Sequence, residues 1–312
     1  MNRLSRAPEA DPLYARPAAE RPSYATGMLL DAQDFTDEQT YHRGRLARAL
    51  VSLTGGGTLA GLRVGHTQAT GGANGRPEEI RVEPGLAIDR FGRLIEIPRP
   101  ACLRLQAWFD AERAADGGDR LRRAAYDNLN LFLSPRAIAE AGTGGRPPIP
   151  ARGVVADVFV RFIACARGLT PSFASGPFEA LDAVATSRVR DAYELQLIAR
   201  DGLDVGFSGL PSPGPELAAI ANLDERRARL QDAILDSYPA SGRAGSPGEL
   251  DPLPEHPAGI DRTAIFIARI VIPVDAANPP ARAGTAVLVD GWRRRFVASS
   301  LLMARWVGIS GG

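Results

Sequence analysis

The strongest constraint on the fold lies in residues 80–98, where two runs of alternating apolar residues flank a short turn. The runs cover residues 80–88 and 94–98, and the five residues between them include one glycine. Alternation on both sides of such a turn is typical of a β-hairpin. Proline cannot donate to a sheet ladder, so Pro84 predicts a bulge or an edge position in the first arm.

The same reasoning places further elements along the chain. Alternating or continuous apolar runs predict strands, at residues 59–64, 126–133, 154–165, 193–199, 263–273 and 287–289. Capping residues before apolar residues three or four positions apart predict helices, at residues 28–54, 106–115, 223–237 and 292–307. For the first helix, Asp31 and Thr36 are both candidate N-caps, and Thr36 with Gln39 fits a capping box. We expect Asp290 to cap the last helix.

This order of elements predicts an α+β fold with a mostly antiparallel, β-rich body, a helix near each end and long ordered loops. The expected parts are an extended N-terminal arm (1–27), a helix-plus-hairpin domain (28–150) and a β-rich domain with a C-terminal helix (151–312). The pattern leaves open whether the last two are separate domains or one mixed sheet. Long loops are uncommon in compact domains unless they are functional, so we interpret them as contact surfaces for neighbouring proteins.

Composition excludes several function classes. The 37 basic and 36 acidic side chains give a net charge of +1, which argues against a nucleic-acid binder or a membrane-surface protein. No apolar run approaches 18 residues, so we expect no membrane insertion. Every basic residue is arginine, which excludes Schiff-base or P-loop lysine chemistry. The first residues lack the pattern of a secretory signal, so we expect synthesis in the cytoplasm.

No catalytic, cofactor or metal site is expected from the motifs. Residues 55–57 are three glycines that formally begin a GxGxxA pattern, but a helix precedes them and a strand follows, the reverse of a dinucleotide site, so they are interpreted as a helix stop. No GxSxG elbow or zinc-ligand spacing occurs. The histidines are His42, His66 and His256. Cys102 and Cys165 are expected to be reduced, buried thiols, with a disulfide between them as the open alternative.

Aromatic and arginine side chains near the two ends of the chain are the candidate protein-contact residues. They are Tyr14, Tyr24, Trp292, Arg293, Arg294, Arg295, Phe296 and Trp306. The last six belong to the expected final helix, whose apolar face would comprise Trp292, Phe296, Ser299, Leu302, Met303 and Trp306. Binding of lipid or nucleic acid is the alternative, but three arginines do not offset the neutral charge of the whole chain, and we favour a docking helix.

Three consecutive segments of the sequence carry a resemblance to known proteins. They read Gly27-Met-Leu-Leu-Asp-Ala-Gln-Asp-Phe-Thr-Asp-Glu-Gln-Thr-Tyr-His-Arg43, Gly57-Thr-Leu-Ala-Gly-Leu-Arg-Val64 and Val82-Glu-Pro-Gly-Leu-Ala-Ile-Asp-Arg-Phe-Gly-Arg-Leu-Ile-Glu-Ile-Pro98. This pattern, with a later match at 185–195, resembles an uncharacterised bacterial family associated with gene clusters for phage-tail-like contractile injection systems. The hairpin is also similar to modules of phage tail-fibre and baseplate proteins.

The resemblance implies a non-enzymatic structural subunit, associated with the baseplate or a fibre, that acts through protein–protein docking. Its expected partners are other tail, baseplate or fibre proteins and further copies of itself, with no nucleic acid and no cofactor. After synthesis in the cytoplasm it would become part of an assembled particle, found outside the cell after lysis. Two alternatives stay open: a cell-surface polysaccharide-binding module, against which the low aromatic content of 6% argues, and a particle-associated hydrolase with a carboxylate pair.

Overall fold

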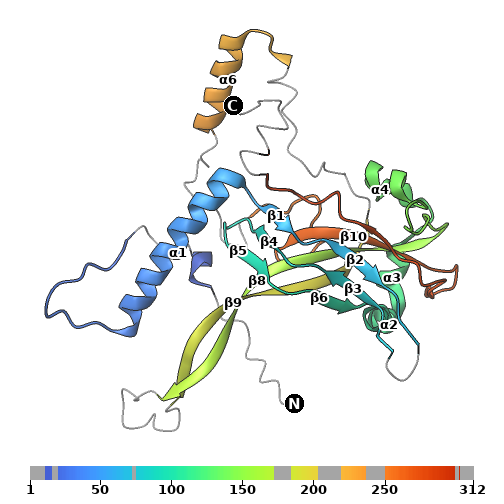
Figure 1. Cartoon of the computed structure of the whole chain (residues 1–312), viewed down its shortest axis with the longest axis horizontal. Coiled ribbons are helices and arrows are strands. Elements are labelled where there is room, and N and C mark those ends of the chain that lie inside the picture. The colour runs from blue at the N-terminus through green and yellow to red at the C-terminus, as the bar shows by residue number, and fades with distance from the viewer. Residues whose placement is uncertain are drawn as a thin grey trace.

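Antiparallel sheets form the body of the protein, and helices lie at its edges (Figure 1). The computed structural model describes residues 11–15, 20–71, 75–171, 184–202, 219–236, 250–298 and 302. Within them, one sheet has the order β1 (Gly57–Gly61), β4 (Gly85–Ile88), β5 (Leu94–Ile97), and a second has β2 (Val64–Thr67), β3 (Glu79–Val82), β6 (Ala101–Arg104). The third sheet has the order β11 (Leu288–Asp290), β10 (Ile265–Pro273), β8 (Gly153–Pro171), β7 (Ala125–Tyr126). A fifth strand of this sheet, β9 (Val184–Ala199), pairs with β8.

The helices and the sheets together confirm the expected α+β class. The α-helices are α1 (Ala32–Thr54), α2 (Leu105–Ala114), α3 (Asp119–Arg123), α4 (Pro135–Glu140) and α6 (Leu223–Asp236). Short 3₁₀ turns are η1 (Pro12–Ala15), η2 (Ala115–Gly118) and η3 (Leu129–Leu131). No helix among the described residues has the length and apolar character needed to cross a membrane.

The predicted hairpin is present as β4 and β5, joined by a turn at residues 89–93. The first arm, however, contains more than a bulge: the chain leaves one sheet as β3 and enters another as β4, with Pro84 between them. The chain passes between the same two sheets a second time, from β1 to β2, and at this point Leu62 is fully buried with a positive φ of 54°. Gly85 is needed here because a side chain would meet the backbone at Leu62.

The central strands β8 and β10 carry the hydrophobic core. Every residue of β10 from Ile265 to Ile272 is buried, and β8 pairs with it from Gly153 to Val160. The largest cluster of buried apolar side chains includes Ile80 and Phe109 as well as Ile267, so it draws on both residue ranges expected to form domains. The division at residues 150 and 151 stays a prediction.

Hydrogen bonds at the helix starts decide between the expected caps. The carboxylate of Asp31 accepts from the backbone N–H groups of Gln33 and Asp34, and Asp34 completes a capping box. Thr36 is therefore not the cap; its hydroxyl donates to the carbonyl of Ala32 within α1. For α6, the side chain of Asn222 accepts from two backbone N–H groups of the first turn, as expected for an N-cap.

The predicted strand at 126–133 is wrong beyond Tyr126. Residues 129–131 form η3, and α4 follows at residues 135–140, where no helix was predicted. The physical reason is the burial spacing: Leu129, Phe132 and Leu133 are buried while Leu131 is exposed. A strand would have placed residues 129, 131 and 133 on one face.

The predicted helix at 292–307 is also wrong across residues 292–298, which are not helical. The carboxylate of Asp290 accepts from the backbone and hydroxyl of Ser134 as well as from the Trp292 N–H, so it joins this segment to the start of α4. The segment then runs beside β1, where the backbone N–H of Thr58 donates to the carbonyl of Arg295. Residues 299–301 and 303–307 lie outside the described residues.

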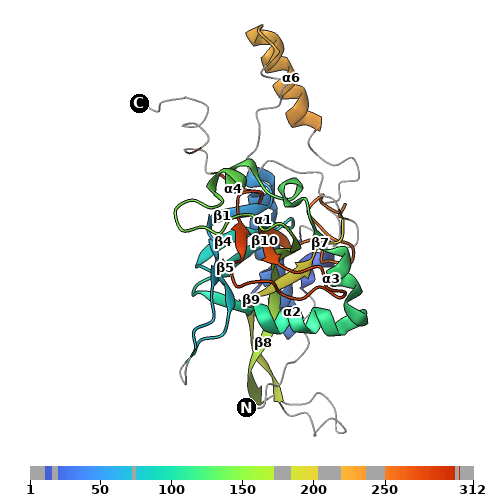
Figure 2. The ribbon, with the colours of Figure 1, turned by 90° about the vertical axis from the view of Figure 1, so that its right-hand side faces the viewer.

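Two elements project from the body (Figures 1 and 2). The strands β8 and β9 stay paired from the core out to Pro171 and Val184. They therefore extend well beyond the predicted strands at 154–165 and 193–199. We call the outer part, residues 165–171 and 184–190, the ribbon. Helix α6 stands on the opposite side of the body in both views.

Candidate functional site

A cleft of about 730 Å³ opens between β2, the loop after α4 and the segment at 286–296. This volume lies within the usual range for small-ligand or short-peptide sites. Six of its lining residues carry aromatic or basic side chains: Arg63, His66, Arg146, Trp292, Arg294 and Phe296. None of the described lining residues is an aspartate or a glutamate. The cleft therefore offers cations and aromatic surface without a lining carboxylate.

Arg294 is the most deeply placed cation of this cleft, with 4% of its surface exposed. Its Nη1 donates to the carbonyl of Leu62 at 2.6 Å and its Nε to that of Gly291 at 2.7 Å. Among the described residues no carboxylate oxygen lies within ion-pairing distance of Arg294, and Nη2 makes no hydrogen bond. Burial lowers the pKa of Arg294 to about 10; the charge of Asp290 opposes this shift and that of Arg63 adds to it. The guanidinium is still protonated at neutral pH.

Arg63 and Arg146 add positive charge at the rim. Arg63 is exposed, and its side chain has no ion pair or hydrogen bond within the described part of the chain. Arg146 pairs with Glu140, whose oxygen lies 2.7 Å from Nη1. Because Arg63 and Arg294 both lower the free energy of a nearby anion, their proximity favours an anionic ligand.

The aromatic wall of the cleft is held in place by α4. The Trp292 Nε1–H donates to Glu140 Oε2 at 3.3 Å, and the guanidinium of Arg136 lies 3.6 Å from the centre of the indole ring. Phe296 lies 5.7 Å from the Arg294 guanidinium. These contacts fix the rings beside the buried cation.

His66 is the one histidine of the described lining, and its Nε2 lies 2.8 Å from Glu78 Oε1. Arg282 also binds both oxygens of Glu78. Burial raises the pKa of Glu78, but the hydrogen bonds from Arg282 and His66 outweigh it and lower that pKa below its usual value. Glu78 is thus held as an anion between two partners, an arrangement that fixes His66 in position.

The structure brings three of the predicted contact residues together and separates the others. Trp292, Arg294 and Phe296 line the cleft. Arg293 is half-buried, and Arg295 donates to Glu255 at 2.7 Å. Trp306 lies outside the described residues.

The two tyrosines differ in their surroundings. Tyr24 is exposed and its hydroxyl donates to Glu38 Oε2 at 2.7 Å. Tyr14 is half-buried against the chain's own hairpin, 5.5 Å from the ring of Phe91 and 4.4 Å from the Arg93 guanidinium. Whether any of the predicted residues contacts another protein stays a prediction.

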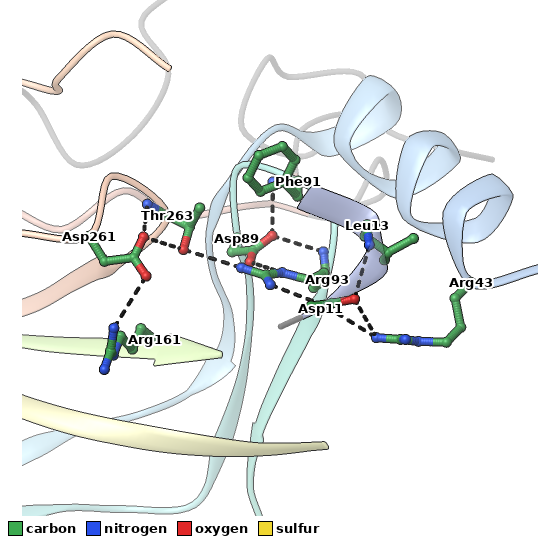
Figure 3. A network of polar contacts seen from close by, with 9 residues as sticks. All are labelled: Asp11, Leu13, Arg43, Asp89, Phe91, Arg93, Arg161, Asp261 and Thr263. Atoms are coloured by element: carbon green, nitrogen blue, oxygen red, sulfur yellow. Dashed lines mark hydrogen bonds and ion pairs between the residues drawn. The ribbon is translucent and has the colours of Figure 1, made fainter. Parts of the chain in front are cut away.

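A buried polar network joins Asp11, at the start of this N-terminal segment, to the hairpin (Figure 3). Arg93 Nε donates to Asp89 Oδ2 at 2.6 Å and Nη1 to Asp11 Oδ2 at 3.1 Å, and Arg43 reaches the same Asp11 carboxylate. Residues 12–15 therefore form the 3₁₀ turn η1 against the body, where an extended arm was expected. The network is structural, because its carboxylates are already neutralised by arginines.

Neither cysteine is buried as expected. Cys102 is exposed, Cys165 is half-buried, and both are free thiols. Cys102 faces outward because β6 alternates between half-buried and exposed positions. Burial and a hydrogen bond to Glu79 raise the pKa of the Cys102 thiol. Within the described chain, no three His, Cys, Asp or Glu side chains are grouped to hold a metal ion.

Sequence reasoning did not find Arg63 and Arg146 as parts of this site. Their separation from Arg294 along the chain exceeds 140 residues, and no motif joins them. In the comparisons with known proteins, no protein-family model and no curated protein matches this chain.

Proposed function

We propose that this protein is a non-enzymatic structural subunit of a phage-tail-like particle, docking onto other proteins of the baseplate or fibre. The particle is suggested by the resemblance at residues 27–98. The docking role is supported by the two projections, the ribbon and α6 (Figures 1 and 2). Elements that project from a core with exposed apolar side chains favour an assembly component over a free monomer.

The ribbon supports docking through its surface. Leu169 is 67% exposed and Val189 is 56% exposed. A two-stranded hairpin is only marginally stable alone in water, and burial of these side chains against a neighbour would stabilise it.

Helix α6 supports docking in the same way. The side chains of its described residues 223–235 are all exposed, among them Leu223, Leu230 and Ile234. These three lie near one helical face, because they are separated by seven and four positions. A helix of this length with one exposed apolar stripe gains most of its stability from packing against another element.

The decisive experiment is affinity purification of the tagged protein from its native host, followed by negative-stain microscopy of the eluate. We expect sheath, tube or baseplate proteins, or whole tail-like particles, in the eluate. A clean monomer from cells that are making particles would contradict the proposal.

A matched pair of variants tests whether the ribbon is the contact. Leu169→Asp should remove the particle proteins from the eluate, while Leu131→Asp should retain them. Leu131 has a similar exposure of 52% but belongs to η3, which is part of neither projection. Equal recovery with both variants would show that the ribbon is not the docking element.

A further inference from the structure

The cleft beside Arg294 has the charge of an anion site whose anion comes from another molecule. Arg294 is buried and hydrogen-bonded only to carbonyls, and one of its terminal nitrogens has no partner among the described residues. A buried cation is expensive unless it is paired. Other buried arginines, such as Arg93 and Arg269, each form an ion pair with a carboxylate. Arg294 differs from them in having only backbone acceptors.

Glycines and the second arginine make room for a ligand at this point. A side chain at Gly291 would lie 2.6 Å from Arg294 Nη2, so glycine leaves that nitrogen accessible. A side chain at Gly65 would meet nothing within 4 Å. With Arg63 exposed nearby, its guanidinium and the Nη2 of Arg294 can both donate to one carboxylate.

The backbone around the cleft favours an extended peptide over a small ion. β2 and β11 are each the last strand of their sheet within the described residues, and residues of both line the cleft. Such edges carry unpaired N–H and C=O groups that can bind an added strand. Val287 and Leu288, together with the rings of Trp292 and Phe296, supply apolar surface that a free phosphate would not use.

We propose that this cleft binds an extended acidic peptide segment of a partner protein, with one carboxylate held by Arg294 and Arg63 and an adjacent apolar side chain against Trp292 and Phe296. The proposal deepens the proposed function by naming the chemistry of the partner, and it rests on that function for the partner's origin. The main determinants of binding are the charge of the segment and its extended backbone.

A direct binding measurement tests this inference. The probe is a fluorescein-labelled peptide of alternating valine and aspartate, blocked at both ends, and its match is the same peptide with asparagine at each aspartate. Fluorescence anisotropy with the full chain should give saturable binding of the aspartate peptide at least tenfold tighter than the asparagine peptide. Added salt should lower the affinity for the aspartate peptide more than that for the asparagine peptide, because exposed charge pairs are screened. Equal affinities for the two peptides would overturn the proposal.

Substitution at the rim keeps the test independent of folding. Arg63→Glu should lower the affinity for the aspartate peptide at least tenfold, because it replaces a cation of the cleft with an anion. The fold should be retained, because Arg63 is exposed and its side chain has no partner among the described residues. Arg99→Glu is the control, since Arg99 is another exposed arginine, outside the cleft lining, and should change the affinity less than twofold. Unchanged affinity in Arg63→Glu would overturn the assignment of this cleft.

Two further results separate the inference from its alternatives. If inorganic phosphate at the same concentration as the peptide displaces it, the cleft is a small-anion site and the peptide assignment is overturned. Peptide binding needs no assembled particle, so it can succeed even if purification from the host yields a monomer. In that case the docking role in a particle fails while the peptide cleft stands.

Discussion

Arg269 and Asp157 are register partners on the two central strands of the main sheet, and both side chains are fully excluded from solvent. Arg269 Nε donates to Asp157 Oδ1 at 2.7 Å, and Nη2 donates to Oδ2 at 3.0 Å. Arg200 Nη1 also reaches Oδ2 at 3.0 Å. One carboxylate thus serves two guanidinium groups inside the core.

Removal of that charge should destabilise the protein strongly. We expect Asp157→Asn to lower the free energy of unfolding by about 3–5 kcal/mol, because two buried cations lose their counterion. Glu194→Gln, which breaks a partly exposed pair with Arg161 on the adjacent strands, should cost less than about 1 kcal/mol. Urea unfolding followed by circular dichroism measures both. Equal losses would mean that the buried pair contributes no more than the surface pair.

The turn of the hairpin should tolerate no side chain at Gly92. Its φ is +84°, and a Cβ there would lie 1.7 Å from the backbone oxygen of Ala47 in α1. Gly55→Ala is the control, since Gly55 also has a positive φ but open space around it. Both variants should lose about 1–2 kcal/mol from backbone strain, and Gly92→Ala about 1–3 kcal/mol more from displacement of α1. If thermal unfolding shows the same loss of stability for the two variants, the close approach of Gly92 to Ala47 is contradicted.

Asp11 should anchor the N-terminal turn to the hairpin. Its carboxylate accepts from Arg93, Arg43 and the backbone of Leu13, and it is almost fully buried. Asp11→Ala should cost about 1–3 kcal/mol, since charged hydrogen bonds are lost in a buried place. Arg43→Ala removes only the more exposed partner and should cost less than about 1 kcal/mol. The midpoint of urea unfolding compares the two, and the reverse order would contradict this role.

His256 should make the fold sensitive to mild acid. Burial lowers its pKa below the ordinary value of 6.5, with a smaller contribution from the charges of Arg90 and Arg295; a hydrogen bond to the carbonyl of Ala264 and the charge of Glu255 oppose the shift. Nδ1 accepts from the Leu253 N–H while Nε2 donates to that carbonyl, so the neutral ring fits its partners. Below pH 6.5 the unfolded chain takes up the proton first, so stability falls as the pH drops.

The measurement is the free energy of unfolding at pH 7.5 and pH 5.0. Wild-type protein and His42→Gln, in which an exposed histidine is replaced, should both lose stability on acidification. His256→Gln should lose clearly less. If all three lose the same amount, His256 is not the group responsible.

Local patterns predicted the elements whose side chains alternate or repeat regularly. The continuous apolar run of β10 is typical of a strand buried on both faces, and all its residues from Ile265 to Ile272 are buried. The second arm of the hairpin, β5, alternates between exposed and buried residues as its sequence predicts. The helix start at Asp31 was equally readable, although Thr36 offered a competing cap. The full length of β8 could not be predicted from the sequence, because the outer residues of this strand have no buried face and so no alternating apolar pattern.

The cleft could not be predicted in the same way. Asp290 binds the N–H of Trp292 in its own following turn, as a cap would, and it also binds Ser134 at the start of α4, which no local pattern indicates. The nonhelical path after Asp290 then brings Arg294 beside Arg63, a tertiary contact with no local signal. Trp292 and Phe296, predicted as contact residues from residue type, both line the cleft, but their predicted placement on a helix was wrong.

The continuity of β8 has a mechanical consequence. The strand runs without a break from its pairing with β10 in the core to its pairing with β9 at Pro171. A pull on the ribbon along its axis loads the hydrogen bonds on both sides of β8 in shear, so many bonds share the force at once. Tension at the outer end would therefore reach the close-packed centre of the molecule directly, because β8 is both a strand of the ribbon and a central strand of the main sheet.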